Sequence, residues 1–296
     1  MRITDSLRTD SLAQNIATGL DNLNTVQGEI STGKRLTQAS DDPIGASQSM
    51  AWRSVSLDTT QYQRDADQAK SFLTVSDGAL GDAGNVIQAA RQIAVQGANS
   101  FQTPDSQIAL SQQVNSLIKQ LTTVANTQIH GKYIFGGTQT QTPPYTVANP
   151  AGANPTPVYG GNSGTMSTTL GPNSTLTINT PGSAVFDGTF QTLQALSANL
   201  ATGNIPAISS NIASLDANLS TNSAVRAAVG SKINQVDDTT QRLTRAQGDY
   251  QSAISKIEDV DLAQAYVQLQ SAQNVYQASL VTTSKAFAHS LVDYLG

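Results

Sequence analysis

Small and apolar residues recur at alternating steps of four and three along two long stretches of this sequence, residues 62–97 and 229–257. A repeat of 3.5 residues keeps one stripe of side chains facing a partner helix, so it predicts left-handed coiled-coil packing. The two stretches lie on either side of a proline-rich middle, so we expect them to pair antiparallel. The predicted coiled-coil seam consists of Leu73, Leu80, Ile87, Ile233, Val236, Leu243, Tyr250 and Ile254.

The two ends of the chain carry a second kind of helical stripe. Residues 12–30 and 262–296 place apolar side chains three and four apart on segments that are otherwise polar and mostly uncharged. Neither end looks able to form a core alone, so we expect the two to pair and to assemble with other subunits. The predicted assembly interface consists of Leu12, Ile16, Leu20, Leu23, Ile30, Leu262, Leu269, Tyr276, Leu280, Phe287 and Leu291.

The middle of the chain has a different composition. Eight of its ten prolines fall between Pro143 and Pro206, and this region is rich in glycine, threonine and asparagine. The runs at 165–170 and 174–180 are separated by a Gly-Pro-Asn turn and predict two paired strands. Residues 132–137 predict a short hairpin just before them.

Shorter helices are expected between these regions. Thr103 can cap a helix whose first turn holds Pro104. Asp187 is the predicted N-cap of another helix, which Gly203 would end. The predicted helices span residues 104–129, 188–202 and 206–221.

The expected fold is mainly α with a small β insertion. Nested N- and C-terminal helices would form an antiparallel coiled-coil rod with the β segment at its tip, and Asp42 would cap a helix that opens at Pro43. We expect three parts: a terminal assembly domain (1–45 with 262–296), a helical rod (46–140 with 187–261) and an outward-facing β-rich insertion (141–186).

Composition excludes several classes of function. Charged residues make up 12% of the chain and the net charge is -5, so clustered cations for nucleic-acid binding are lacking. The chain has no cysteine for disulfides or thiolate chemistry. No apolar run approaches the length of a membrane span, and the first residues lack the pattern of a cleaved secretion signal, so we expect no membrane insertion.

No residue pattern points to catalysis. Gly28 to Lys34 match the first seven positions of a phosphate-binding loop, but Arg35 stands where Mg²⁺ coordination needs Ser or Thr. Glu258 and its acidic neighbours lack the spacing of a calcium loop, and a solvated helix junction is the favoured interpretation. We therefore predict no enzyme activity, no cofactor and no metal.

Four segments together resemble a known family. Residues 30–35 (ISTGKR) followed by 40–43 (SDDP), 131–138 (GKYIFGGT), 256–263 (KIEDVDLA) and 290–295 (SLVDYL) occur in this order. They resemble the hook-associated protein 3 family of the flagellin superfamily. This resemblance covers both ends of the chain and leaves residues 141–186 unmatched.

The resemblance implies a structural subunit at the junction between the flagellar hook and filament. It implies export through the flagellar type III apparatus without a cleaved signal, an export chaperone, and an extracellular homo-oligomeric ring between hook-associated protein 1 and flagellin. Filament flagellin is the first alternative, although the STGKR, SDDP and SLVDYL segments disfavour it. A secreted binding protein that recognises a ligand through the β insertion is the second.

Overall fold

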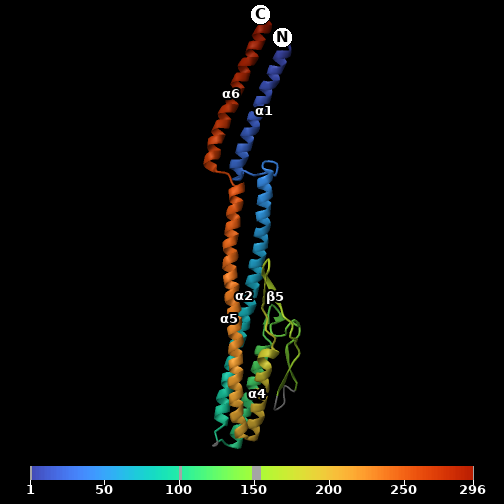
Figure 1. The fold of residues 1–296 in the computed structure, drawn as a ribbon, viewed down its shortest axis with the longest axis vertical. Coiled ribbons are helices and arrows are strands. Elements are labelled where there is room, and N and C mark those ends of the chain that lie inside the picture. Colours follow the sequence, from blue (N-terminus) through green and yellow to red (C-terminus); the bar gives the residue numbers. More distant parts are fainter. Residues whose placement is uncertain (1, 100–101, 149–154, 296) are drawn as a thin grey trace. The chain divides into compact units, whose positions relative to one another are not determined.

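The computed structural model describes residues 2–99, 102–148 and 155–295, and describes side chains at residue 7 and between residues 10 and 285 within those ranges. Helices dominate the described chain, so the expected mainly α fold with a small β insertion is confirmed. The helices are α1 (Arg2–Thr32), α2 (Pro43–Gly97), α3 (Pro104–Ala125), α4 (Ser183–Thr202), α5 (Ile205–Glu258) and α6 (Leu262–Leu295) (Figure 1).

The chain packs into two compact units. Unit 1 comprises Met1–Asp58 with Ala246–Gly296, and unit 2 comprises Thr59–Arg245. Each unit therefore combines segments from both halves of the sequence, as a nested topology requires. The three-part division predicted from the sequence stays a prediction, because compact packing does not reveal which segments fold independently.

In unit 2, α2 and α5 run antiparallel. Ion pairs join them at three levels: Lys70–Asp237 at 2.6 Å, Asp77–Arg226 at 3.1 Å and Arg91–Asp216 at 2.6 Å. The partner on α5 moves toward the N-terminus as the partner on α2 moves toward the C-terminus, which is the antiparallel order predicted. Helices α3 and α4 pack against each other and add their apolar faces to the same core.

Several predicted helix ends agree with the structure. Thr103 Oγ1 accepts a hydrogen bond of 3.3 Å from the Ser106 amide, and Pro104 opens α3. Gly203 ends α4 with a φ of 67°, a left-handed conformation that glycine adopts without strain. The predicted helices at 206–221 and 229–257 are one helix, α5, because no proline or turn residue interrupts the chain between them.

Two predicted helix boundaries are wrong. Helix α4 begins at Ser183 rather than at residue 188, so Asp187 lies inside the helix and is not its N-cap. Burial of Val185 and Phe186 against the core favours the earlier start. Helix α3 stops at Ala125 because Gln128 and the residue after it enter a strand.

Three two-stranded antiparallel hairpins form the β region: β1 (Gln128–Ile129) with β2 (Lys132–Tyr133), β3 (Tyr145–Ala148) with β4 (Thr156–Tyr159), and β5 (Ser167–Gly171) with β6 (Ser174–Thr177). The last pair confirms the two strands predicted around residues 171–173. The hairpin predicted at 132–137 is displaced, because the left-handed His130 and Gly131 form its turn. The β3–β4 pair was not predicted.

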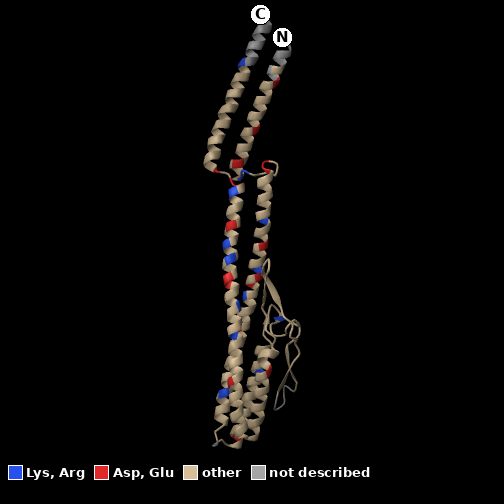
Figure 2. Ribbon diagram, viewed as in Figure 1, with Lys and Arg blue, Asp and Glu red and all other residues tan. Residues whose placement is uncertain are grey.

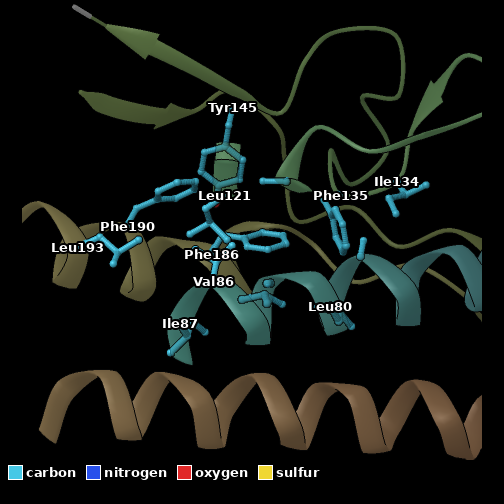
Figure 3. Close-up of a cluster of buried hydrophobic side chains, with 14 of the residues drawn as sticks. Leu80, Val86, Ile87, Leu121, Ile134, Phe135, Tyr145, Phe186, Phe190 and Leu193 are labelled. Carbon is cyan, nitrogen blue, oxygen red and sulfur yellow. The ribbon is translucent and has the colours of Figure 1, made fainter. Parts of the chain in front are cut away.

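The hairpins lie along the side of the helices in unit 2 and not at their tip, which corrects the expected placement (Figure 1). An aromatic cluster explains this position. Tyr145 of β3 lies 4.9 Å from Phe190 and 6.0 Å from Phe186, measured between ring centroids, and Phe186 lies 4.9 Å from Phe135 (Figure 3). Phe186 and Phe190 lie on α4 and all four rings are buried, so the strands must lie against helices to cover them.

Candidate functional site

In unit 1, the segment that follows α1 contacts the segment that links α5 to α6, and we call this contact the crossing. The loop after α1 and the link between α5 and α6 form a short antiparallel contact. The Val260 amide donates to the Gly33 carbonyl at 3.1 Å, and Lys34 and Asp259 form a β-bridge. Gly33 has a φ of 70°, which turns the chain out of α1.

Glu258 lies at the centre of this contact. Its Oε2 accepts from Lys34 Nζ at 2.9 Å and from Arg53 Nη2 at 2.5 Å. Its Oε1 accepts from Arg53 Nε at 2.9 Å and from the Ser49 hydroxyl. Arg53 therefore binds both carboxylate oxygens, the bidentate geometry that its guanidinium favours. We call Lys34, Ser49, Arg53 and Glu258 the Glu258 clamp.

Burial and charge make the Glu258 clamp unlike the other ion pairs in the described chain. The Glu258 side chain is 7% exposed, whereas every other carboxylate in a described salt bridge is at least about a third exposed. Hydrogen bonds from Arg53, with smaller ones from Ser49 and Lys34, lower the pKa of Glu258 to about 2 although burial opposes them. The same pairing raises the pKa of Arg53.

Three further carboxylates order the segments around the clamp. Asp42 Oδ1 accepts from the Gly45 amide at 2.9 Å, so it caps α2 as predicted. Asp261 Oδ1 caps α6 by accepting from the Ala263 amide at 2.9 Å. Backbone hydrogen bonds, the largest from the Gln38 amide, lower the pKa of Asp41 in the loop.

The sequence interpretation of this junction was wrong in one respect. It predicts a solvated junction, but the Glu258 carboxylate is buried and fully occupied by donors. Lys34 of the partial phosphate-loop pattern is its ion-pair partner. The family-like segments 30–35 and 256–263 each contain one member of the pair, which is the only signal that sequence offers. Their pairing across more than 200 residues could not be read from periodicity.

The structure brings most predicted seam residues inward. In unit 2, Leu73, Leu80, Ile87 and Val236 are buried, while Ile233 and Leu243 are half-buried. In unit 1, Ile254 is buried and Tyr250 stacks on Trp52 with ring centroids 5.7 Å apart. Their role as a coiled-coil seam stays a prediction.

The predicted assembly residues divide between half-buried and exposed positions. Leu20, Leu262 and Leu280 are exposed at 40%, 50% and 43%. Half-buried residues are Leu12, Ile16, Leu23, Ile30, Leu269 and Tyr276. The side chains of Phe287 and Leu291 lie outside the described residues. Helices α1 and α6 pack against each other, and Figure 2 shows few charged residues on the described part of α6.

A hollow of about 570 Å³ in unit 2 offers a place to test the binding-protein alternative. It lies between α2 and two hairpins and is lined by apolar side chains including Phe72, Ile129 and Met166, together with Asp67 and Lys132. Among the described residues, no cluster of His, Cys, Asp or Glu could hold a metal ion. No described helix is long and apolar enough to cross a membrane.

Comparison with known families matches both ends of the chain. Residues 4–140 match the bacterial flagellin N-terminal helical region, and residues 212–295 match the bacterial flagellin C-terminal helical region. The chain belongs to the flagellin superfamily. This confirms the resemblance seen in the four sequence segments.

Individual relatives of this flagellin-superfamily chain come from two groups. Flagellar hook-associated protein 3 of Escherichia coli is 32% identical over 119 residues, which cover 40% of this chain and 38% of that protein. The match thus spans less than two fifths of that relative's length. Flagellin of Halalkalibacterium halodurans is 24% identical over 290 residues, which cover 97% of this chain and 96% of that protein.

A solved structure shares the fold. A flagellar hook-associated protein from Vibrio parahaemolyticus superimposes with a TM-score of 0.67 at 19% identity, covering 74% of this chain and 100% of that one. Since so low an identity speaks only for the fold, this likeness supports the helical architecture and not a shared partner.

Proposed function

We propose that this chain is a structural subunit of the bacterial flagellum that joins the hook, through hook-associated protein 1, to the flagellin filament. It acts by assembly and not by catalysis, and it needs no cofactor. It works outside the cell as a homo-oligomeric ring, after type III export with the help of a chaperone.

The apolar surface of α6 carries this proposal. Tyr266, Val267 and Leu280 expose 57%, 71% and 43% of their surface. The sequence from Leu262 to Ser284 contains no charged residue. Burying apolar surface yields about 25 cal/mol per Å², so such a helix gains from neighbours that cover it. Few charges also let many copies pack closely without repulsion.

The kind of neighbour follows from the relatives. The Escherichia coli relative is named for its association with the hook. The SLVDYL ending and the STGKR and SDDP segments of this chain resemble that group more than filament flagellin. These segments lie in the family-matched ends, which is where flagellar subunits of this superfamily would meet.

Filament flagellin is the second candidate. The near full-length similarity to the Halalkalibacterium halodurans flagellin favours it, because that match extends over 97% of this chain and the match to the hook-associated relative over 40%. A filament subunit would use the same exposed face of α6 but would add copies without limit.

Location on the flagellum distinguishes the two candidates. The test uses gold-labelled antibodies against the purified chain on isolated flagella, together with a strain that lacks its gene. A junction subunit should give one narrow band between hook and filament, and its loss should release flagellin into the medium while hooks remain. Label along the whole filament would overturn the junction proposal and support filament flagellin.

A further inference from the structure

Most described side chains of helices α1 and α6 are exposed or half-buried. Among their described side chains, only Ala265 and Thr283 are buried, and Gly19 is the one buried position on α1. Most of the stability of a helix in a protein comes from packing an apolar face, so this pair has little to fix its register. A helix pair with so few buried side chains between its members can slide by a turn at small cost.

The contacts of the pair nevertheless follow a single register. At the crossing, Gly33 meets Val260 and Lys34 meets Asp259. Further along, the surface of α1 at Gly19 lies against Tyr276, where a Cβ on Gly19 would be 3.7 Å from Tyr276 Cδ2. Gly19 lies 13 residues before the end of α1, and Tyr276 lies 14 residues after the start of α6. Both helices therefore advance by nearly equal lengths from the crossing.

At that starting point the Glu258 clamp adds a buried carboxylate with ion-pair partners to the backbone hydrogen bonds of the crossing, such as the bond of 2.7 Å from the Arg35 amide to the Glu258 carbonyl. It ties Lys34, two residues after the end of α1, to Ser49 and Arg53 of α2 and to Glu258, the last residue of α5. Arg35 adds a hydrogen bond of 2.9 Å from Nη2 to the Ile257 carbonyl. Removing the carboxylate would leave two cations facing each other with no shared partner, which opens the contact.

We infer that the Glu258 clamp sets the register of the terminal helix pair: Glu258 fixes the crossing, and the crossing determines which residues of α1 meet which residues of α6. This makes Glu258 a positioning residue for a surface it does not itself form. The inference concerns the single chain, so it goes beyond the proposed function and holds for a junction subunit or a filament subunit alike.

Hydrogen exchange on the full chain tests the clamp. Glu258→Gln keeps the size of the side chain and removes its charge. The matched control is Asp259→Asn, since the carboxylate of this adjacent acid accepts from the Ser255 hydroxyl of α5, while the residue joins the crossing through its backbone. We expect amides of α1 and α6 to exchange at least about tenfold faster in Glu258→Gln, equivalent to about 1.4 kcal/mol, with no change in Asp259→Asn.

Unit 2 provides the internal reference for folding. Helices α3 and α4 belong to the buried core of unit 2, so their protection should stay at the wild-type level in both variants. Equal exchange of α1 and α6 in wild type and Glu258→Gln would overturn the inference. Wild-type helices that already exchange like an unfolded chain would overturn it as well, because no register would then be held.

Cross-linking measures the register itself. The chain has no cysteine, so a pair introduced at Gly19→Cys and Tyr276→Cys reports only that contact. A Cβ at position 19 would lie 4.0 Å from the Tyr276 Cα, a separation compatible with a disulfide. The control pair, Gly19→Cys with Gln273→Cys, requires a slip of about one turn.

The two cross-links give opposite expectations. With Glu258 present, the Gly19→Cys/Tyr276→Cys pair should oxidise readily and the control pair poorly. With Glu258→Gln added, we expect this preference to fall at least about fivefold as the helices sample shifted registers. An unchanged preference would show that helix packing alone fixes the register and that the clamp does not.

Discussion

Glu258 makes unit 1 sensitive to acid. Its pKa in the folded chain is about 2, below the value near 4.3 of an unfolded glutamate. The clamp's contribution is therefore complete above about pH 4.3 and is lost as pH falls toward 2. The pKa of Asp41 is lowered as well, so its protonation at low pH also weakens the fold. Only a comparison of variants therefore isolates the effect of Glu258.

The first prediction follows from that sign. Between pH 5 and pH 2.5, the free energy of opening α1 and α6 should fall by on the order of 2 kcal/mol in the wild type. This figure allows for solvent screening of the half-exposed Lys34 and Arg53 side chains. In Glu258→Gln this fall should be mostly absent. Hydrogen exchange at both pH values measures it, and an equal fall in the two proteins would assign the acid sensitivity to other carboxylates.

At the level of elements, we expect the α2–α5 pair to contribute most of the stability of unit 2. Leu80 is fully buried between these helices, and Asn222 of α5 donates to its carbonyl at 2.9 Å. The fit is close, since a Cβ at Gly84 would lie only 3.1 Å from the Asn222 amide nitrogen. A charge placed here has no room to reach water.

The second prediction is that Leu80→Asp destabilises unit 2 by at least about 3 kcal/mol, because a buried carboxylate without a partner must be desolvated or protonated. The matched control is Val95→Asp, which places the same charge at a site on α2 that is 51% exposed. Thermal unfolding should show a large drop for Leu80→Asp and a small change for Val95→Asp. Similar curves for both would mean that the seam is misplaced.

Local signals predicted some elements and missed others for physical reasons. Thr103 and Gly203 act on their own helix ends, so their roles follow from neighbours in sequence. Asp187 has the same cap chemistry, yet tertiary burial of Phe186 starts the helix before it. The β3–β4 pair joins two four-residue strands, too short for an alternation to be recognised.

The Glu258 clamp shows the other limit of sequence reasoning. Lys34 and Glu258 lie in segments that were recognised, at residues 30–35 and 256–263, whereas Ser49 and Arg53 lie in α2 outside them. Nothing local distinguishes an acid that pairs across the fold from one that faces water. Asp259 and Asp261 illustrate this, since the first accepts from the Ser255 hydroxyl of α5 and the second caps α6. Burial alone separates Glu258 from them, and burial is a property of the folded chain.

At the scale of the whole molecule, unit 1 combines a weakly packed helix pair with a well-bonded crossing where α1 ends and α6 begins. The Glu258 clamp holds the crossing, while α1 and α6 leave apolar side chains to solvent. A core would make the pair stable alone, but it would consume the surface that neighbouring copies cover in the proposed assembly. The scarcity of buried residues among the described side chains of the terminal helices therefore agrees with the proposed function.

The final prediction tests that surface with Leu280→Asp. Because Leu280 is 43% exposed, the substitution should change monomer stability by no more than about 0.5 kcal/mol. The proposed assembly would bury the same position against a neighbour, so the charge should prevent the junction from forming. Cells that carry the variant should export the protein, lose their filaments and release flagellin, as seen by electron microscopy and by analysis of the medium.

Gln277→Asp is the matched control, since it adds the same charge one turn away at an exposed polar position of α6. It should leave both motility and monomer melting near the wild type, because no apolar surface is lost. The competing view is that α6 stabilises only its own subunit. A Leu280→Asp protein that melts earlier as a monomer yet still supports motility would establish that view and reject assembly through this face.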